Sequence, residues 1–153
     1  MTRGRLTALA LTAVALVTAC QLVLSPAERR ALEAARARWE ASGITAYTVE
    51  SRYLCFCGPH LLAWTRLTIR GDSVVATEPL EPLPRGAEPD LAGWRTVSQL
   101  FTTIAEADRD DILEDVTATY DAALGYPRAI ALRCTPAVAD CGITYELRNL
   151  QPN

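Results

Sequence analysis

The chain contains no lysine and only one histidine, and both absences narrow its chemistry. All 15 basic residues are arginine, and they stand against 18 acidic residues for a net charge of -3. The arginines form no strongly basic stripe, so nucleic acid is not expected as a partner. His60 is the sole histidine and no nucleophile-elbow motif occurs, so a serine–histidine–acid triad is not indicated. We expect a protein that is not an enzyme.

Two common ligand sites are also missing. No glycine-rich loop of the kind that cradles phosphates occurs. An acidic cluster follows residue 107, but it lacks the ligand spacing and central glycine of a calcium loop. We interpret the cluster as a solvated loop, and we expect no cofactor. Its members are Asp108, Asp110, Asp111, Glu114 and Asp115.

The first 20 residues have the plan of a bacterial export signal. A basic segment ending at Arg5 precedes an uncharged apolar run over 6–17, and small residues stand directly before Cys20. A cysteine in this position resembles the lipobox of bacterial lipoproteins, where the cysteine becomes the first mature residue and carries acyl chains. The predicted division is a signal peptide over 1–19, a lipidated tether over 20–25 and a single domain over 26–153.

An uncleaved transmembrane helix is the alternative, because residues 6–24 are almost continuously apolar and about long enough to span a bilayer. Both interpretations place the rest of the chain outside the cytoplasm, since the basic end stays inside. Anchoring through several acyl chains is strong, because each buried CH2 contributes roughly 0.8 kcal/mol. We expect a cell-envelope protein that is lipid-anchored to a membrane and faces outside the cytoplasm.

Capping residues predict two helices. Ser25-Pro26-Ala27-Glu28 combines an N-cap serine, a proline at the first helical position and a glutamate at N3, and Ser42-Gly43 supplies the stop. Thr96-Val97-Ser98-Gln99 is a second capping box, and this helix is expected to end near Asp108. Apolar residues recur at helical spacing after both boxes: Leu32, Ala35 and Trp39, then Val97, Leu100, Phe101 and Ile104.

Alternating patterns predict six strands, over 47–57, 62–70, 73–77, 116–120, 128–134 and 141–150. Gly71-Asp72 is a two-residue hairpin signal, and the prolines of 78–90 indicate an extended, exposed connector. The order helix, strands, helix, strands predicts an α+β fold, with one antiparallel sheet of about six strands and both helices on one face. It reads as two similar α-β-β-β units. Trp64, Trp94 and Tyr126 could line a binding surface, but we expect them in the core.

Four cysteines remain when Cys20 is set aside, and an even number favours disulfides in an exported domain. By strand parity, Cys55, Cys57, Cys134 and Cys141 all fall on the apolar face. Residues i and i+2 of an extended strand lie about 6.6 Å apart, near the upper limit for a disulfide. A Cys55–Cys57 bridge therefore requires a bulge or a strand end. A Cys134–Cys141 bridge and crossed pairs that tie the two halves together are also open.

A metal or redox site is the alternative use of the first cysteine pair. Cys55, Cys57 and His60 lie within six residues, and thiolates with imidazole suit zinc or copper(I). The spacing is Cys-x-Cys, whereas zinc ribbons and thioredoxin-like motifs use Cys-x-x-Cys. We therefore prefer structural disulfides and assign no metal.

Two motifs are specific: Cys55-Phe56-Cys57, and Tyr120-Asp121 followed by Gly125-Tyr126-Pro127. Over about residues 30–152, the chain resembles an uncharacterised family of bacterial secreted proteins and lipoproteins, a domain of unknown function. The resemblance implies no activity, ligand or catalytic residue. It implies a Cys-Phe-Cys pair without a second pair, whereas this chain adds Cys134 and Cys141. The resemblance therefore favours two local bridges, Cys55–Cys57 and Cys134–Cys141.

The sequence thus predicts a non-catalytic binding or structural module of the bacterial envelope. Its expected partners are the membrane, through the lipid anchor, and an envelope protein or wall ligand. A metal-binding or thiol-redox protein that uses Cys55, Cys57 and His60 is the alternative.

Overall fold

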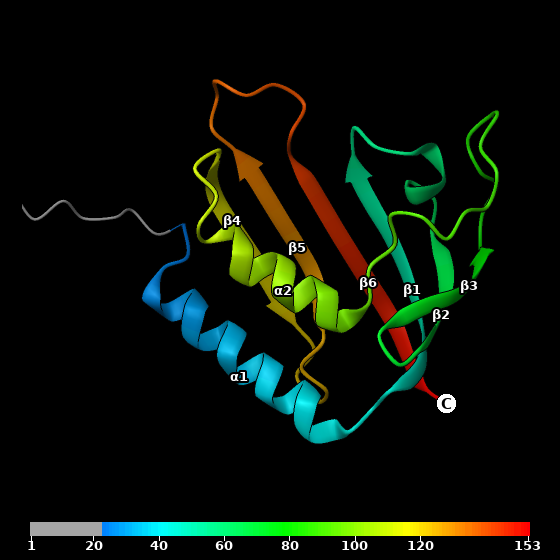
Figure 1. Cartoon of the computed structure of the whole chain (residues 1–153), viewed down its shortest axis with the longest axis horizontal. Helices are drawn as coiled ribbons and strands as arrows, with labels where there is room; N and C mark the ends of the chain where they lie inside the picture. Colours follow the sequence, from blue (N-terminus) through cyan, green and yellow to red (C-terminus); the bar gives the residue numbers. More distant parts are fainter. Residues whose placement is uncertain (1–22) are drawn as a thin grey trace, which may run out of the picture.

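The computed structural model describes residues 23–153, so the predicted signal peptide and Cys20 lie outside the described residues. Six antiparallel strands form one sheet, and two helices lie on one of its faces (Figure 1). The predicted α+β fold is confirmed. None of the helices within residues 23–153 is long and apolar enough to cross a membrane.

The element order follows the predicted one, with shifted strand ends. In chain order the elements are α1 (Pro26–Ser42), β1 (Ala46–Cys55), the 3-10 helix η1 (Pro59–Leu61), β2 (Thr65–Arg70), β3 (Ser73–Pro79), α2 (Val97–Ala107), β4 (Leu113–Tyr120), β5 (Pro127–Cys134) and β6 (Ile143–Pro152). The predictions that β1 reaches Cys57 and that β2 begins at Leu62 are wrong. Pro59 lacks a backbone N–H and starts η1, so the chain leaves the ladder between them.

The strand order is β3-β2-β1-β6-β5-β4, so each half is a three-stranded meander. The halves join where β1 pairs antiparallel with β6, from Tyr47↔Pro152 to Cys55↔Ile143. The two predicted α-β-β-β units are present along the chain. Their first strands differ in place, because β1 lies at the centre of the sheet and β4 at its edge.

Both predicted capping boxes are present, and the second one is held against the sheet. Thr96 caps α2 and donates its hydroxyl hydrogen to Asp72 in the β2–β3 hairpin. Two tyrosines of β1 accept hydrogen bonds from backbone N–H groups at the same place: Tyr47 from Val97 at 2.9 Å, and Tyr53 from Arg95 at 2.7 Å. Burial raises the pKa of Tyr47 to about 12, so its hydroxyl stays protonated.

Apolar side chains from both helices and the inner face of the sheet form one core. Trp39 of α1 packs edge-on against Tyr47, with ring centroids 5.3 Å apart. Trp94 and Tyr126 are each 6% exposed, in agreement with their predicted place in the core, whereas Trp64 is only half-buried. Other fully buried members are Leu67, Ile69, Leu100, Phe101, Ile104, Val116 and Ile130.

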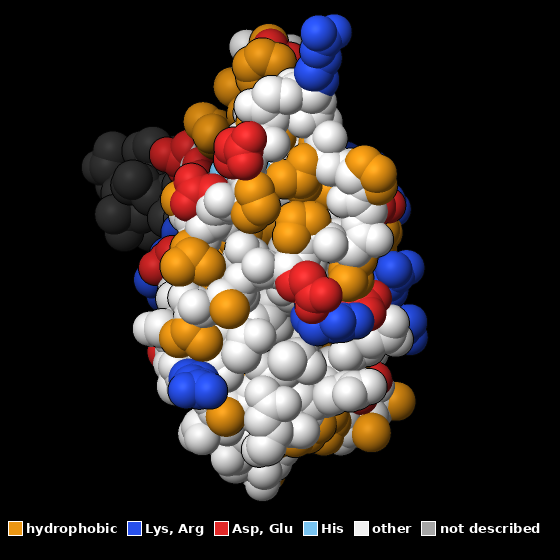
Figure 2. Space-filling model, turned by 90° about the vertical axis from the view of Figure 1, so that its right-hand side faces the viewer, with side chains coloured by type: hydrophobic (Ala, Val, Ile, Leu, Met, Phe, Trp, Pro, Cys, Tyr) orange, Lys and Arg blue, Asp and Glu red, His pale blue; other side chains and the backbone are white. Residues whose placement is uncertain are grey.

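The edge strand β3 pairs with β2 alone, and its sequence limits further pairing. Val75 is an extra residue opposite the register shift between Thr68 and Ile69, and Pro79 ends the strand. A bulge and a proline protect a sheet edge from adding another strand. Figure 2 views the molecule from this side. Hydrophobic side chains gather in the upper half, where Figure 1 places the connection between β3 and α2.

Gly125 fixes the distance between the β4–β5 turn and α1. Its φ is +82°, and an added Cβ would lie 2.2 Å from the carbonyl oxygen of Ala35. Gly43, at the end of α1, has φ +65° and open space around the same position. Alanine substitutions at Gly43 and Gly125 therefore distinguish the cost of backbone strain alone from the cost of strain combined with steric overlap.

We expect Gly43→Ala to lower the free energy of unfolding by about 1–2 kcal/mol, the cost of a left-handed backbone. Gly125→Ala should cost more, about 2–5 kcal/mol, because overpacking adds about 1–3 kcal/mol to the same backbone cost. Urea unfolding followed by circular dichroism measures both changes. Equal losses in the two variants would contradict the close approach of this turn to α1.

Candidate functional site

The four cysteines form two local disulfides at one end of the sheet. The Cα atoms of Cys55 and Cys57 are 5.3 Å apart, and those of Cys134 and Cys141 are 6.1 Å apart. The first bridge closes because β1 ends at Cys55, as an i, i+2 disulfide requires. Cys141 precedes β6, so its predicted place in that strand is wrong. Phe56, inside the first bridge, is 88% exposed.

His60 is engaged by the backbone. Its Nε2 atom lies 2.9 Å from the carbonyl oxygen of Ala92. Its ring also lies beside Trp94, with centroids 6.3 Å apart. Within residues 23–153, no three His, Cys, Asp or Glu side chains are grouped to hold a metal ion. Among the described residues, no further metal-ligating side chain is grouped with Cys55, Cys57 and His60.

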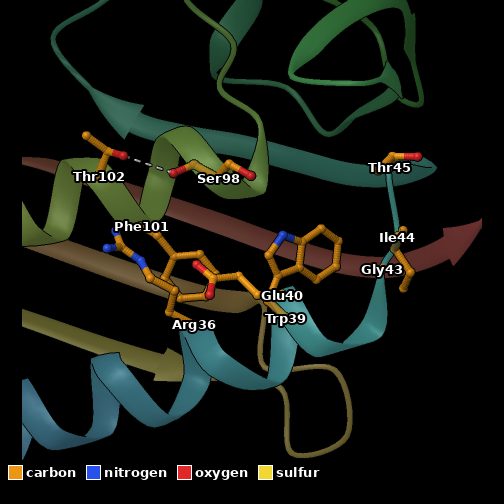
Figure 3. A pocket seen from close by; sticks show the side chains of 9 residues that line it. All are labelled: Arg36, Trp39, Glu40, Gly43, Ile44, Thr45, Ser98, Phe101 and Thr102. Carbon is orange, nitrogen blue, oxygen red and sulfur yellow. Dashed lines mark hydrogen bonds between the residues drawn. The ribbon is translucent and has the colours of Figure 1, made fainter.

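A groove runs between α1 and α2 and has two hollows of about 420 Å³ each, which share Arg36. The first hollow is the one in Figure 3, where Trp39 and Phe101 supply the aromatic side chains. The Arg36 guanidinium lies 5.6 Å from the centre of the Phe101 ring. The Thr102 hydroxyl donates to the carbonyl oxygen of Ser98 and is thereby engaged. Charged side chains of both signs also line the groove, among them Arg29, Glu33 and Glu40.

Asp108 is not part of a solvated loop, and this part of the acidic-cluster prediction is wrong. Its side chain is 9% exposed and accepts a hydrogen bond from the backbone N–H of Leu24 at 2.8 Å. Arg29 donates to the other carboxylate oxygen at 2.7 Å and to the carbonyl oxygen of Leu24 at 3.0 Å. We call these three residues the Asp108 clamp. It joins the start of the described chain to the end of α2.

The face of the sheet opposite the helices carries most of the ion pairs. The helices cover the other face (Figure 1), and arginine side chains lie along the right-hand margin of Figure 2. The ion pairs are Arg66–Glu78, Arg66–Glu50, Arg148–Glu50, Arg52–Glu146 and Arg133–Asp115. Paired surface charges contribute little to stability.

The regular β1–β6 pairing places Arg148 on this open face, opposite Glu50, and a bulge in β6 follows it. Asn149 has φ +53°, a conformation that asparagine tolerates, and lies where the β1–β6 register shifts. As a result Arg148 Nε and Asn149 Nδ2 both donate to Glu50 Oε2, at 2.9 and 3.0 Å. Desolvation acts to raise the pKa of Glu50, but these hydrogen bonds outweigh it and the pKa is lowered.

Trp64 lies beside two arginines in a hollow of about 330 Å³ on the open face. The Cζ atoms of Arg148 and Arg52 are 3.9 and 4.8 Å from the centre of the Trp64 ring. Arg52 Nε donates to Glu146. The hollow is lined by Arg52, Trp64, Thr119, Tyr120, Arg128, Ala129, Glu146, Leu147 and Arg148. We call it the Arg–Trp hollow, and it is the candidate functional site.

No pattern in the sequence predicted this hollow. Trp64 was expected in the core, but it precedes β2 and stands opposite Arg52, on the outward side of the pleat. The polar positions of β1 and β6 indicated an outward face. The pairing that brings Arg148 to Trp64 joins residues far apart in the chain, and no local pattern reports it.

We expect Asp108→Ala to lower the free energy of unfolding by about 1–3 kcal/mol, because it leaves the Leu24 N–H and the Arg29 guanidinium without their partner. The neighbouring Asp111 is exposed, and Asp111→Ala should change stability by less than about 0.5 kcal/mol. Chemical denaturation of both variants gives the comparison. Similar midpoints would contradict the role of the clamp.

Comparison with known proteins gives a family and no activity. Residues 31–152 match the family of unknown function DUF6174. No curated protein and no solved structure matches the chain. The match spans most of the chain and nearly all of the sheet and both helices. The chain therefore belongs to the family of unknown function DUF6174.

Proposed function

We propose that this protein is a non-catalytic binding module of the bacterial cell envelope, anchored by a lipid on Cys20, and that it binds its partner with the open face of the sheet. The observation that carries the proposal is the Arg–Trp hollow. Aromatic and arginine side chains are enriched where proteins bind partners. An uncovered sheet face that presents both supports a role in binding.

The lipid anchor is supported by the N-terminal sequence. A basic start, an apolar run and small residues before Cys20 together match the plan of a lipoprotein signal. Two disulfides fit a compartment outside the cytoplasm, because such bonds persist in oxidising surroundings. The two bridges pair the four cysteines of the domain with one another, so neither of them uses Cys20.

The anchor is tested by cell fractionation of the chain and of its Cys20→Ser variant in a bacterial host. We expect the wild-type chain in the membrane fraction, with an intact mass that begins at Cys20 and includes acyl chains. Cys20→Ser should lose this modification, and Gln21→Ala, which leaves the cysteine and the small residues before it intact, should keep it. An unmodified wild-type mass that retains residues 1–19 would favour the uncleaved transmembrane helix.

The metal or thiol-redox alternative is tested by alkylation of the full chain before and after reduction, with metal analysis of the same sample. We expect the four cysteines of the domain to react only after reduction, because each lies in a disulfide. Peptide mapping should recover Cys55 with Cys57 and Cys134 with Cys141. Free Cys55 and Cys57 thiols, or bound zinc or copper that His60→Asn removes, would instead support the alternative.

A further inference from the structure

The arginines of the Arg–Trp hollow keep their terminal nitrogens free. Arg148 and Arg52 use Nε for their hydrogen bonds to Glu50 and Glu146. Among residues 23–153, no hydrogen bond from an Nη atom of either arginine is present. Arg128, which also lines the hollow, makes no ion pair within the same part of the chain. The hollow therefore presents several unused charged donors.

These donors are held in place before any ligand arrives. Arg148 is fixed by its hydrogen bond to Glu50 and by its position 3.9 Å from the centre of the Trp64 ring. Arg52 is fixed by Glu146 and by the same ring at 4.8 Å. A planar guanidinium held in this way loses little conformational entropy on binding. Its free Nη edge suits two oxygens of one planar group.

The charge of the hollow favours a single negative charge. Three arginines and one glutamate, Glu146, line it, which leaves a formal excess of two positive charges. Glu50 lies beside the hollow, its pKa is lowered by its hydrogen bonds, and its charge reduces the excess to one positive charge. Two carboxylates this close disfavour the second charge of a phosphate more than the one charge of a carboxylate.

From this geometry we infer that the Arg–Trp hollow binds the carboxylate of a ligand, with the Nη atoms of Arg148 and Arg52 as donors. The inference rests on the proposed binding function and gives its ligand a chemical class. Trp64 and Ala129 supply apolar surface for the carbon atoms next to the carboxylate. Arg128 adds a third positive charge at the β5 side of the hollow.

The test is a titration of the ¹⁵N-labelled full chain in a nonionic detergent at low salt, followed by NMR. The probe is N-acetyl-alanyl-alanine with a free carboxylate, and its matched control is the same peptide with a C-terminal amide. We expect saturable shifts of the Trp64 indole N–H and the Arg148 Nε–H for the carboxylate. The amide peptide should bind at least tenfold more weakly. Added salt should lower the affinity for the carboxylate peptide.

Two substitutions of Arg148 distinguish carboxylate binding by its planar guanidinium from nonspecific electrostatic attraction to the hollow. Arg148→Gln should weaken carboxylate binding at least tenfold, and Arg148→Lys should weaken it severalfold because an ammonium cannot bind two oxygens in one plane. Arg133→Gln is the matched control, because Arg133 lies on the same face but pairs with Asp115 outside the hollow. It should leave the affinity unchanged. The backbone spectrum of each variant reports whether the fold persists.

Equal affinity for the carboxylate and amide peptides would overturn the inference, as would an unchanged affinity in a folded Arg148→Gln. Saturation by inorganic phosphate without saturation by the carboxylate peptide would overturn the assignment to carboxylate. These failures would overturn the ligand class given to the open face and would leave the proposed lipid anchor intact. The lipid anchor is read from fractionation and mass, and neither depends on the hollow.

Discussion

The pairing of β1 with β6 is the constraint on which the rest of the structure depends. Each half of the sheet is a local meander, and this ladder is what makes them one sheet. Pairing strands so far apart in sequence carries a loop-closure cost that local hairpins avoid. The same ladder sets Arg52 opposite Glu146 and Arg148 opposite Glu50. The Arg–Trp hollow therefore exists only where this ladder is formed.

The features that the sequence predicted well are the ones that neighbouring residues decide. Both helices begin at a capping box, where a side chain and a backbone group three residues apart satisfy each other. The strands follow from alternation, and the β2–β3 hairpin from Gly71-Asp72. Strand ends were less accurate. At Cys57 the apolar pattern continued, but Gly58-Pro59 directed the chain out of the ladder.

The features that the sequence did not predict arise from contacts between distant segments. Asp108 looked like one more acid in a charged run, and only its position next to Leu24 and Arg29 makes it a buried partner. Trp64 looked like a core residue, because the alternation around it does not show which strand lies alongside. In both cases the residue type was informative about chemistry, and tertiary pairing decided the role.

The Asp108 clamp has a consequence for how an anchored molecule would stand. Leu24 is fixed to the domain, and its Cα lies four residue-to-residue steps from that of Cys20, a distance of about 14 Å at most in an extended chain. With the proposed lipid on Cys20, this segment would be a short tether that holds the domain close to the membrane. The end of the domain that holds Leu24 and the last turn of α2 would rest against the headgroups. The open face of the sheet would then stand roughly upright, reachable from the side by a ligand close to the membrane.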